Sequence, residues 1–213
     1  MNPLLPDSQA LRDEMVEYQL VRRGIMDKAL LDVMRAVPRE FFVPPAEIRY
    51  AYDDRALPIQ SGQTISQPYV VALTLEAAKI EPHHAILEIG TGTGYVVALL
   101  SRLAAKVFTI EYHKTLADAA RARLVELGNT NVEFRTGDGS FGWLEAAPFD
   151  AILAAAAAPK VPQAWKDQIA PDGRIVAPVG RMHQRLIRLT RQDDGSFAEE
   201  FLCNVRYVPL LGG

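Results

Sequence analysis

Apolar and polar positions alternate differently in the two parts of this chain. From residue 85 onward, short apolar runs of strand length alternate with helical stretches. Such alternation predicts a parallel sheet with helices on both of its faces, an α/β fold of the doubly wound, Rossmann-like kind. The expected strands are 85–89, 107–111, 132–136, 149–155 and 173–178, and the expected helices are 95–105, 114–127 and one after Pro162.

Two further strand-like runs follow, at 185–191 and 197–208. They are joined through Asp193-Asp194-Gly195, a turn signal that is typical of a hairpin. We therefore expect an antiparallel edge on a mostly parallel sheet of seven strands.

The first 80 residues have mainly helical periodicity. Helices are expected over 10–22, ended by Gly24, over 28–37, capped by Asp27 and ended by Pro38, and over 68–79. The proline- and aromatic-rich stretch 39–62 predicts irregular structure or a short hairpin. We expect one domain over 1–213, in which a helical segment (1–80) precedes an α/β core (81–213).

Composition narrows the class of protein. The chain has 213 residues, 49% of them hydrophobic, with 23 Lys and Arg against 26 Asp and Glu and a formal net charge of −3. The core is large enough to need no disulfide, and the single Cys203 cannot form one within the chain. Residues 1–7 lack the features of a signal peptide and no apolar run is long enough to span a membrane. We expect a cytoplasmic, monomeric protein that binds neither membrane nor nucleic acid, since the basic loop 181–185 is short.

The strongest local signal is a glycine-rich turn. Glu88-Ile89 ends a buried strand, Gly90-Thr91-Gly92-Thr93-Gly94 follows, and a helix begins at Tyr95. Free backbone N–H groups in such a turn lie beside a ligand. The dinucleotide fingerprint needs its third glycine where Tyr95 stands, so the spacing fits an S-adenosylmethionine loop better. The plainer interpretation is a tight turn without a ligand.

Acidic residues follow the next two strands. Glu111 can accept hydrogen bonds from both ribose hydroxyls, and Asp138-Gly139 is placed to contact the adenine amino group. Alone, Glu111 could be a helix cap and Asp138-Gly139 a surface turn. Their order after successive parallel strands predicts convergence on one nucleotide-binding crevice.

The end of the fourth expected strand carries no polar side chain. Residues 154–158 are all alanine, which argues against the polar tetrapeptide of amine methyltransferases. Small side chains there either pack against a helix or leave room for a substrate backbone. The four histidines show no metal-ligand spacing, so no metal is expected. A carboxylate acceptor, ionised at neutral pH, would need alignment and desolvation but no general base.

One segment resembles a particular family. The stretch 56–69, with Gln63-Thr64-Ile65-Ser66-Gln67-Pro68 at its centre, is similar to the signature of protein-L-isoaspartate O-methyltransferases. The likeness covers nearly the whole chain, including 23–25, 37–44, 86–95, 137–139, 146–150, 156–159, 178–180 and 205–210.

The resemblance implies a class I methyltransferase fold and an activity. Such enzymes use S-adenosylmethionine to esterify the free α-carboxylate of L-isoaspartyl residues in damaged proteins and peptides, and the ester then closes to a succinimide. It implies Ser66 as the active-site serine, which we interpret as a hydrogen-bond donor to the acceptor carboxylate because no base for a nucleophilic serine is found. Ser66 could instead cap the helix that begins near Pro68.

The resemblance also implies the binding residues. Thr64, Ile65 and Ser66 flank the cofactor, and Ile65, Ala155 and Ala156 border the substrate. The expected cofactor residues further along the chain are Glu88, Gly90, Thr91, Gly92, Gly94, Glu111, Asp138 and Gly139. The sequence departs from the family pattern at Gln60-Ser61, Val96 and Ala155, and none of these departures removes a group that the chemistry requires.

Other functions remain open from the residues. The same fold and cofactor could serve a dedicated acceptor, either an ordinary Asp in a partner peptide or a small-molecule oxygen. A non-catalytic binding module on this scaffold is a third hypothesis. An NAD-dependent oxidoreductase is the last, and the glycine spacing disfavours it.

Overall fold

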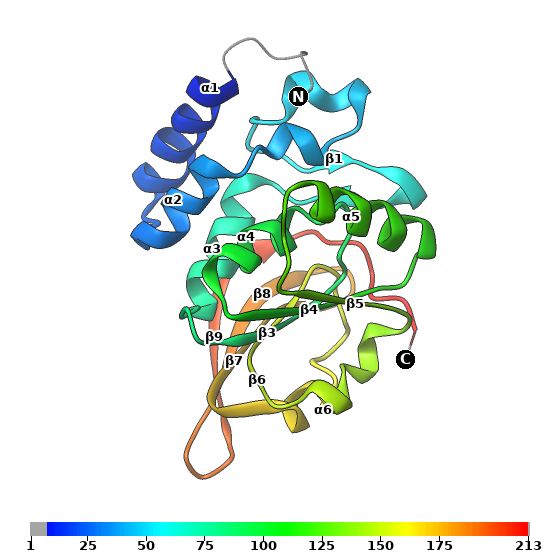
Figure 1. The fold of residues 1–213 in the computed structure, drawn as a ribbon. Helices are drawn as coiled ribbons and strands as arrows, with labels where there is room; N and C mark the ends of the chain where they lie inside the picture. Colours follow the sequence, from blue (N-terminus) through cyan, green and yellow to red (C-terminus); the bar gives the residue numbers. More distant parts are fainter. Residues whose placement is uncertain (1–7, 213) are drawn as a thin grey trace.

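The computed structural model describes residues 8–212 and has a seven-stranded sheet at its centre (Figure 1). The strand order is β5-β4-β3-β6-β7-β8-β9. The first five strands in that order are parallel, and β8 and β9 are antiparallel, as predicted. The strands are β3 (Ala85–Ile89), β4 (Lys106–Glu111), β5 (Val132–Thr136), β6 (Phe149–Ala154), β7 (Ile169–Val179), β8 (Gln184–Arg191) and β9 (Phe197–Val205).

The chain reverses its direction of progress at β3. From β3 it moves outward through β4 to β5, and it then returns to place β6 on the other side of β3. This reversal is a topological switch point, where open parallel sheets bind ligands beyond the carboxyl ends of their strands. The glycine-rich turn begins there, directly after β3.

The central strands are apolar on both faces because both faces are covered. On β3, Ile86 packs into one hydrophobic cluster and Leu87 and Ile89 into another. The first face is covered by α2 (Lys28–Ala36), α3 (Pro68–Ala78), α4 (Tyr95–Leu103) and α5 (Lys114–Glu126). The second face is covered by α6 (Gln163–Asp167), with Trp165 at its centre, and by the 3-10 turns Gly139–Phe141 and Leu144–Ala146.

The first expected helix is not one continuous α-helix. An α-helix, α1 (Ser8–Glu14), continues as a π-helix (Met15–Leu20) and a 3-10 turn (Val21–Arg23) before Gly24 ends it at φ +93°. Met15, Val16 and Leu20 are buried in the first hydrophobic cluster, so this irregular end of the helix packs against the core. Asp27 caps α2 as predicted, since its Oδ1 accepts from Leu30 N at 3.1 Å.

The stretch 39–62 consists of short irregular pieces. It holds 3-10 turns at Arg39–Phe42, Pro45–Tyr50 and Gln60–Gly62, and β1 (Leu57–Pro58) pairs with β2 (Thr64–Ile65) as a small hairpin. These pieces lie above the first face of the sheet (Figure 1). We call residues 39–66 the cover segment.

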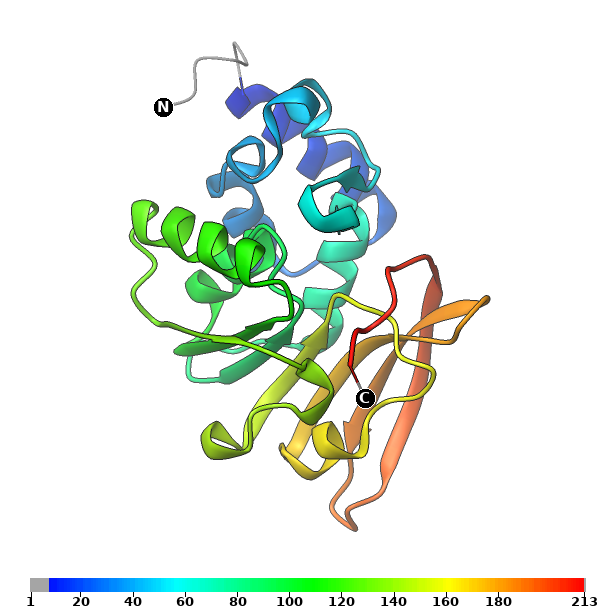
Figure 2. The same cartoon turned by 90° about the vertical axis from the view of Figure 1, so that its right-hand side faces the viewer.

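The sequence placed two strand ends wrongly. β7 begins at Ile169 because residues 170–173 bulge out of the pairing with β6, so the strand starts before the turn-like Pro171-Asp172-Gly173. β9 ends at Val205, and the residues after it turn back beside the loop that follows β6 (Figure 2). There Ala157 N donates to Val208 O and Leu210 N to Ala157 O, both at 2.8 Å. Within residues 8–212, no helix has the length and apolar character needed to cross a membrane.

Candidate active site

A cleft lies beyond the carboxyl ends of β3, β4 and β6. It contains about 550 Å³ of empty space, part of it open to solvent. Several residues predicted from the sequence line it together, namely Thr64, Gly90, Gly92, Glu111, Gly139, Ala155 and Ala156. The crevice expected from the strand order is therefore present, with the cover segment on one side through Thr64.

Glu111 ends β4, and backbone N–H groups orient its carboxylate. Its Oε2 accepts from Gly92 N at 2.8 Å, and its Oε1 accepts from His113 N at 2.9 Å. The side chain is only 5% exposed, yet it borders the cleft. Because each carboxylate oxygen has a second lone pair, both can accept a further hydrogen bond from a ligand hydroxyl.

Two glycines allow close packing around the cleft. A Cβ on Gly90, whose φ is +97°, would lie 3.3 Å from Ala155 Cβ. A Cβ on Gly139 would overlap the Ile89 side chain. Larger residues at either place would push these neighbours, which themselves line the cleft, out of position.

Glu88 does not reach the cleft and instead supports the glycine-rich turn from below. Its Oε2 accepts from Thr109 Oγ1 at 2.8 Å, and Thr109 Oγ1 lies 2.6 Å from Thr91 Oγ1. Burial and the nearby Glu111 together raise the pKa of Glu88 to about 8. The hydrogen bond from Thr109 acts in the opposite direction. Glu88 is thus mostly protonated at neutral pH, which avoids a buried charge.

Gly139 lines the cleft next to β5, and the predicted Asp138 precedes it without lining the cleft. Asp138 Oδ1 accepts from Ser140 N at 2.8 Å and so caps the 3-10 turn that follows. Trp165 Nε1 donates to Gly139 O at 2.9 Å and fixes that turn on the second face of the sheet. The backbone of Gly212 lies against the Asp138 carboxylate.

Ser66 lies between β2 and α3 and does not cap that helix. The N-cap residue of α3 is Gln67, which makes no side-chain cap bond, and Tyr69 N donates to Asp54 Oδ1 at 3.1 Å instead. The capping alternative for Ser66 is therefore wrong, because an aspartate from the cover segment takes that place. The Ser66 hydroxyl faces the Tyr207 hydroxyl instead.

Ser66 connects two spaces beside the cofactor cleft. It lines an open groove of about 750 Å³ together with Thr64, Gln67 and the chain after β9. It also lines a smaller cavity that it shares with Glu88, Ala155 and Tyr207. Burial raises the pKa of Tyr207, partly opposed by the hydroxyl groups of Ser66 and Thr74 beside it.

The remaining predicted residues are close to the cleft without lining it. Ile65, Glu88 and Thr91 are buried behind its wall, and Gly94 is the N-cap of α4, with φ +89°. Sequence reasoning missed residues that do line it, which are Gln63, Tyr112, His113, Gly137 and 208–211. Gln63 Nε2 and His113 Nε2 lie 3.5 Å apart across the cleft entrance, a pairing that no local pattern signals.

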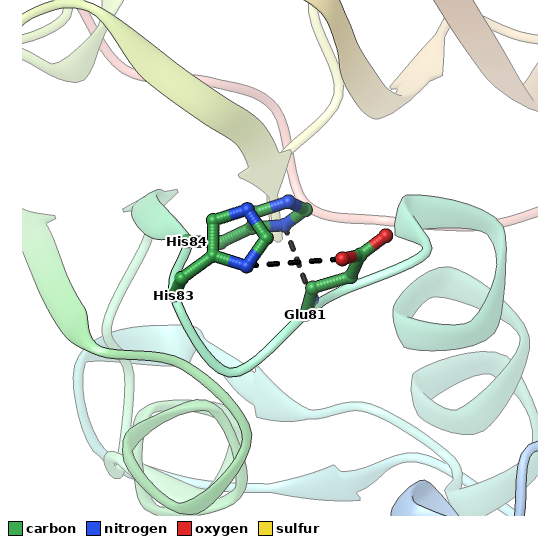
Figure 3. Close-up of side chains that lie close together, drawn as sticks. All are labelled: Glu81, His83 and His84. Carbon is green, nitrogen blue, oxygen red and sulfur yellow. Dashed lines mark hydrogen bonds and ion pairs between the residues drawn. The ribbon is translucent and has the colours of Figure 1, made fainter.

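Glu81, His83 and His84 gather in the turn before β3 (Figure 3). One ligand-type atom from each lies within 4.8 Å of the others. However, His84 Nδ1 accepts a hydrogen bond from Glu81 N at 3.1 Å, so its lone pair is in use and the proton of the neutral ring is on Nε2. This arrangement stabilises the turn without a metal ion, and the expectation of no metal stays a prediction.

Comparison with known proteins gives consistent findings. The family model described as protein-L-isoaspartate(D-aspartate) O-methyltransferase matches residues 10–213. A protein-L-isoaspartate O-methyltransferase of Methylorubrum extorquens (strain PA1) is 54% identical over 210 residues, which cover 98% of this chain and 92% of the relative. One of Roseiflexus sp. (strain RS-1) is 52% identical over 195 residues, 91% of this chain and 89% of the relative.

Solved structures show the same fold. A protein-L-isoaspartate O-methyltransferase superposes with a TM-score of 0.83 at 28% identity, over 95% of this chain and 66% of that longer one. A Plasmodium falciparum structure, described as a putative enzyme of the same kind in complex with S-adenosyl-L-homocysteine, gives 0.81 at 24% identity, over 93% of this chain and 97% of that one.

Proposed function

Because the chain belongs to the protein-L-isoaspartate(D-aspartate) O-methyltransferase family, it is an S-adenosylmethionine-dependent carboxyl methyltransferase, and we propose the part that each residue of its cleft takes in that reaction. Its substrates are isoaspartyl residues of damaged proteins and peptides. The ester that it forms begins their repair. The single observation that supports our assignment of residues is the meeting of the predicted loop, carboxylate and cover segment in one cleft.

The residues of the cleft fit a nucleoside cofactor. The Glu111 carboxylate is held by two backbone N–H groups and retains acceptor capacity, which suits the two hydroxyls of a ribose. Gly90 and Gly139 let the lining of the cleft pack closely, because a Cβ would press on Ala155 at the first and overlap Ile89 at the second. We propose that Glu111 binds the ribose, that Gly90, Gly92 and Gly94 shape the loop, and that Asp138 and Gly139 contact the adenine. Glu88 and Thr91 support this site from behind.

Ser66 is placed to orient the acceptor carboxylate. It borders the groove on the outer side and the cavity beside Ala155 on the inner side. A substrate carboxylate that enters from the groove would meet its hydroxyl as a hydrogen-bond donor. Thr64, Ala155 and Ala156 then border the acceptor, with Ile65 buried behind them, and the two alanines leave room for a peptide backbone.

Methyl transfer to a carboxylate requires the protein mainly to align the two reactants. The bound cofactor supplies an activated methyl group on a sulfonium leaving group. A carboxylate oxygen, already ionised at neutral pH, forms the new O–CH₃ bond while the C–S bond breaks and sulfur keeps the electron pair. No proton moves in this step. The protein contributes in-line positioning and exclusion of water.

The test compares one peptide in two forms, isoaspartyl and normal aspartyl, with labelled S-adenosylmethionine. Transfer only to the isoaspartyl form is expected.

Ser66→Ala should lower turnover about 100-fold, as loss of one positioned donor does, while cofactor binding stays intact. Ser101→Ala is the matched control, because that hydroxyl donates to Ala98 O within α4 and accepts from Asn129 Nδ2, away from the cleft. Wild-type turnover in Ser66→Ala would contradict the role given to Ser66, and transfer only to a dedicated acceptor would contradict the substrate.

We also propose that the chain works as a single domain and a monomer in the cytoplasm, without a nucleic acid partner. One hydrophobic cluster joins residues 11–80 to the sheet, as expected of a single domain. The formal net charge of −3 gives no general attraction for nucleic acid. Light scattering over a range of protein concentrations should give the mass of one chain throughout.

A further inference from the structure

Arg39, the first residue of the cover segment, is a fully buried arginine. Its Nε donates to Ala51 O at 2.8 Å, and its Nη2 donates to Ser66 O at 2.7 Å. The guanidinium carbon lies 5.0 Å from the centre of the Tyr95 ring. Its side chain is 0% exposed.

The Arg39 guanidinium forms no ion pair with a carboxylate among residues 8–212. The buried guanidinium is held by carbonyl oxygens and an aromatic face, while burial lowers the pKa of Arg39. Removing a charge from water without a counter-charge costs several kcal/mol, which an apolar side chain in the same place would avoid. Filling space is therefore a poor account of this residue.

The three contacts of Arg39 come from three different parts of the site. Ala51 follows the second 3-10 turn of the cover segment, and Ser66 is the proposed substrate-orienting serine. Tyr95 is the first residue of α4, directly after the glycine-rich turn. A single side chain thus connects the substrate side of the cleft to the cofactor side.

We propose that Arg39 is a positioning residue, which fixes the backbone at Ser66 relative to the glycine-rich turn and thereby sets the alignment of acceptor and methyl donor. The inference rests on the role of Ser66 proposed above. Arg39 touches neither substrate nor cofactor and acts through Ser66. Since in-line transfer is sensitive to displacements of about 1 Å, losing this connection should cost turnover more than binding.

The experiment uses Arg39→Met and Arg39→Lys with the isoaspartyl peptide. Arg39→Met should lower kcat about 100-fold, with little change in the dissociation constant of S-adenosylmethionine. Arg39→Lys, which keeps the charge and can restore one hydrogen bond, should recover part of the loss and serves if Arg39→Met does not fold.

Arg12→Met is the matched control. Arg12 is another buried arginine that packs on the cover segment, but its Nη1 donates to Glu40 and Tyr52 and does not reach Ser66. It should lower the melting temperature to a similar extent while kcat stays near wild type. An equal loss of kcat in both variants would reduce Arg39 to a stabilising residue and overturn the proposal.

A double variant separates this inference from the function on which it rests. If Arg39 acts through Ser66, Arg39→Met should cost much less in a Ser66→Ala background than in the wild type. Full additivity, or unchanged kcat in folded Arg39→Met and Arg39→Lys, would overturn the role of Arg39 while leaving Ser66 in place. Wild-type turnover in Ser66→Ala alone would instead contradict the proposed function.

Discussion

The two walls of the cleft obtain their polar contacts in different ways. The cofactor wall is formed by the loops after β3, β4 and β6. Backbone hydrogen bonds hold these loops, since Gly90 N donates to Ile110 O and Ala155 N to Ile89 O, both at 2.8 Å. The cover segment lacks a ladder beyond its two-residue hairpin, and side chains add contacts to it. Arg39 donates to two of its carbonyls, and Asp54 joins it to α3 by accepting from Tyr69 N.

The difference shows how a regular and an irregular wall keep their shape. In a parallel sheet each backbone group finds its partner through the ladder, so the loops at its end are positioned by the fold itself. Irregular backbone must find partners in local turns, such as Ala51 N to Ile48 O, and in side chains, and here Arg39 provides two of them. The cofactor wall should therefore be sensitive to added volume and the cover segment to lost side-chain contacts.

Gly139→Val should have the largest effect, on the cofactor wall. Its new side chain would overlap Ile89 in the core of the sheet, so we expect loss of S-adenosylmethionine binding and several kcal/mol of folding free energy. Gly62→Ala in the cover segment is the control, because nothing lies within 4 Å of its Cβ and only its φ of +67° opposes the change, at about 1 kcal/mol. Calorimetry measures the binding of S-adenosylmethionine, and denaturant unfolding measures the folding free energy. Equal losses in Gly139→Val and Gly62→Ala would contradict the difference between the two walls.

Glu88→Gln should change how stability depends on pH. The folded-state pKa of about 8 exceeds the ordinary value of 4.5, so the stability contributed by protonated Glu88 is fully present below about pH 4.5 and is lost as pH rises through 8. The wild type should lose a few kcal/mol of unfolding free energy over that range. The glutamine variant should show a flatter profile and exceed the wild type at pH 9. Parallel profiles would mean that Glu88 is not protonated in the folded protein.

Glu111→Gln should have the smallest of these effects. It should weaken the binding of S-adenosylmethionine. Losing hydrogen bonds to a charged acceptor costs about 1.5–3 kcal/mol, so the dissociation constant of S-adenosylmethionine should rise about 10- to 100-fold. Glu133→Gln on β5 is the control, an exposed glutamate paired with Lys106 at the surface. An unchanged dissociation constant in Glu111→Gln would refute the ribose contact.

The same contrast explains what the sequence could predict. Glu111 and the glycine-rich turn were found because strand periodicity places them at one edge of a sheet. The antiparallel hairpin was found through its turn residues. The bulge at 170–173 was missed because Pro171 and Gly173 indicate the end of a strand, whereas here the pairing resumes beyond them.

The cover segment was less accessible to this reasoning. Its irregularity was predicted from its prolines, but the role of Arg39 depends on contacts 12 and 27 residues away along the chain. The alternative role of Ser66 as a helix cap failed because Asp54, distant in sequence, supplies the cap. Residues 208–211 were missed as cleft residues for the same reason, since they reach the cleft only by returning from the far edge of the sheet.

The returning segment after β9 has a consequence for biosynthesis. Residues 208–210 pair with Ala157 and border the cofactor cleft, whose other walls come from much earlier in the chain. On the ribosome, the sheet from β3 to β7 can assemble before this segment has left the exit tunnel. Affinity for S-adenosylmethionine should therefore appear only once residues 208–210 have emerged, and a nascent chain arrested with β9 outside the tunnel and these residues still inside it should carry a folded sheet that cannot yet retain its cofactor.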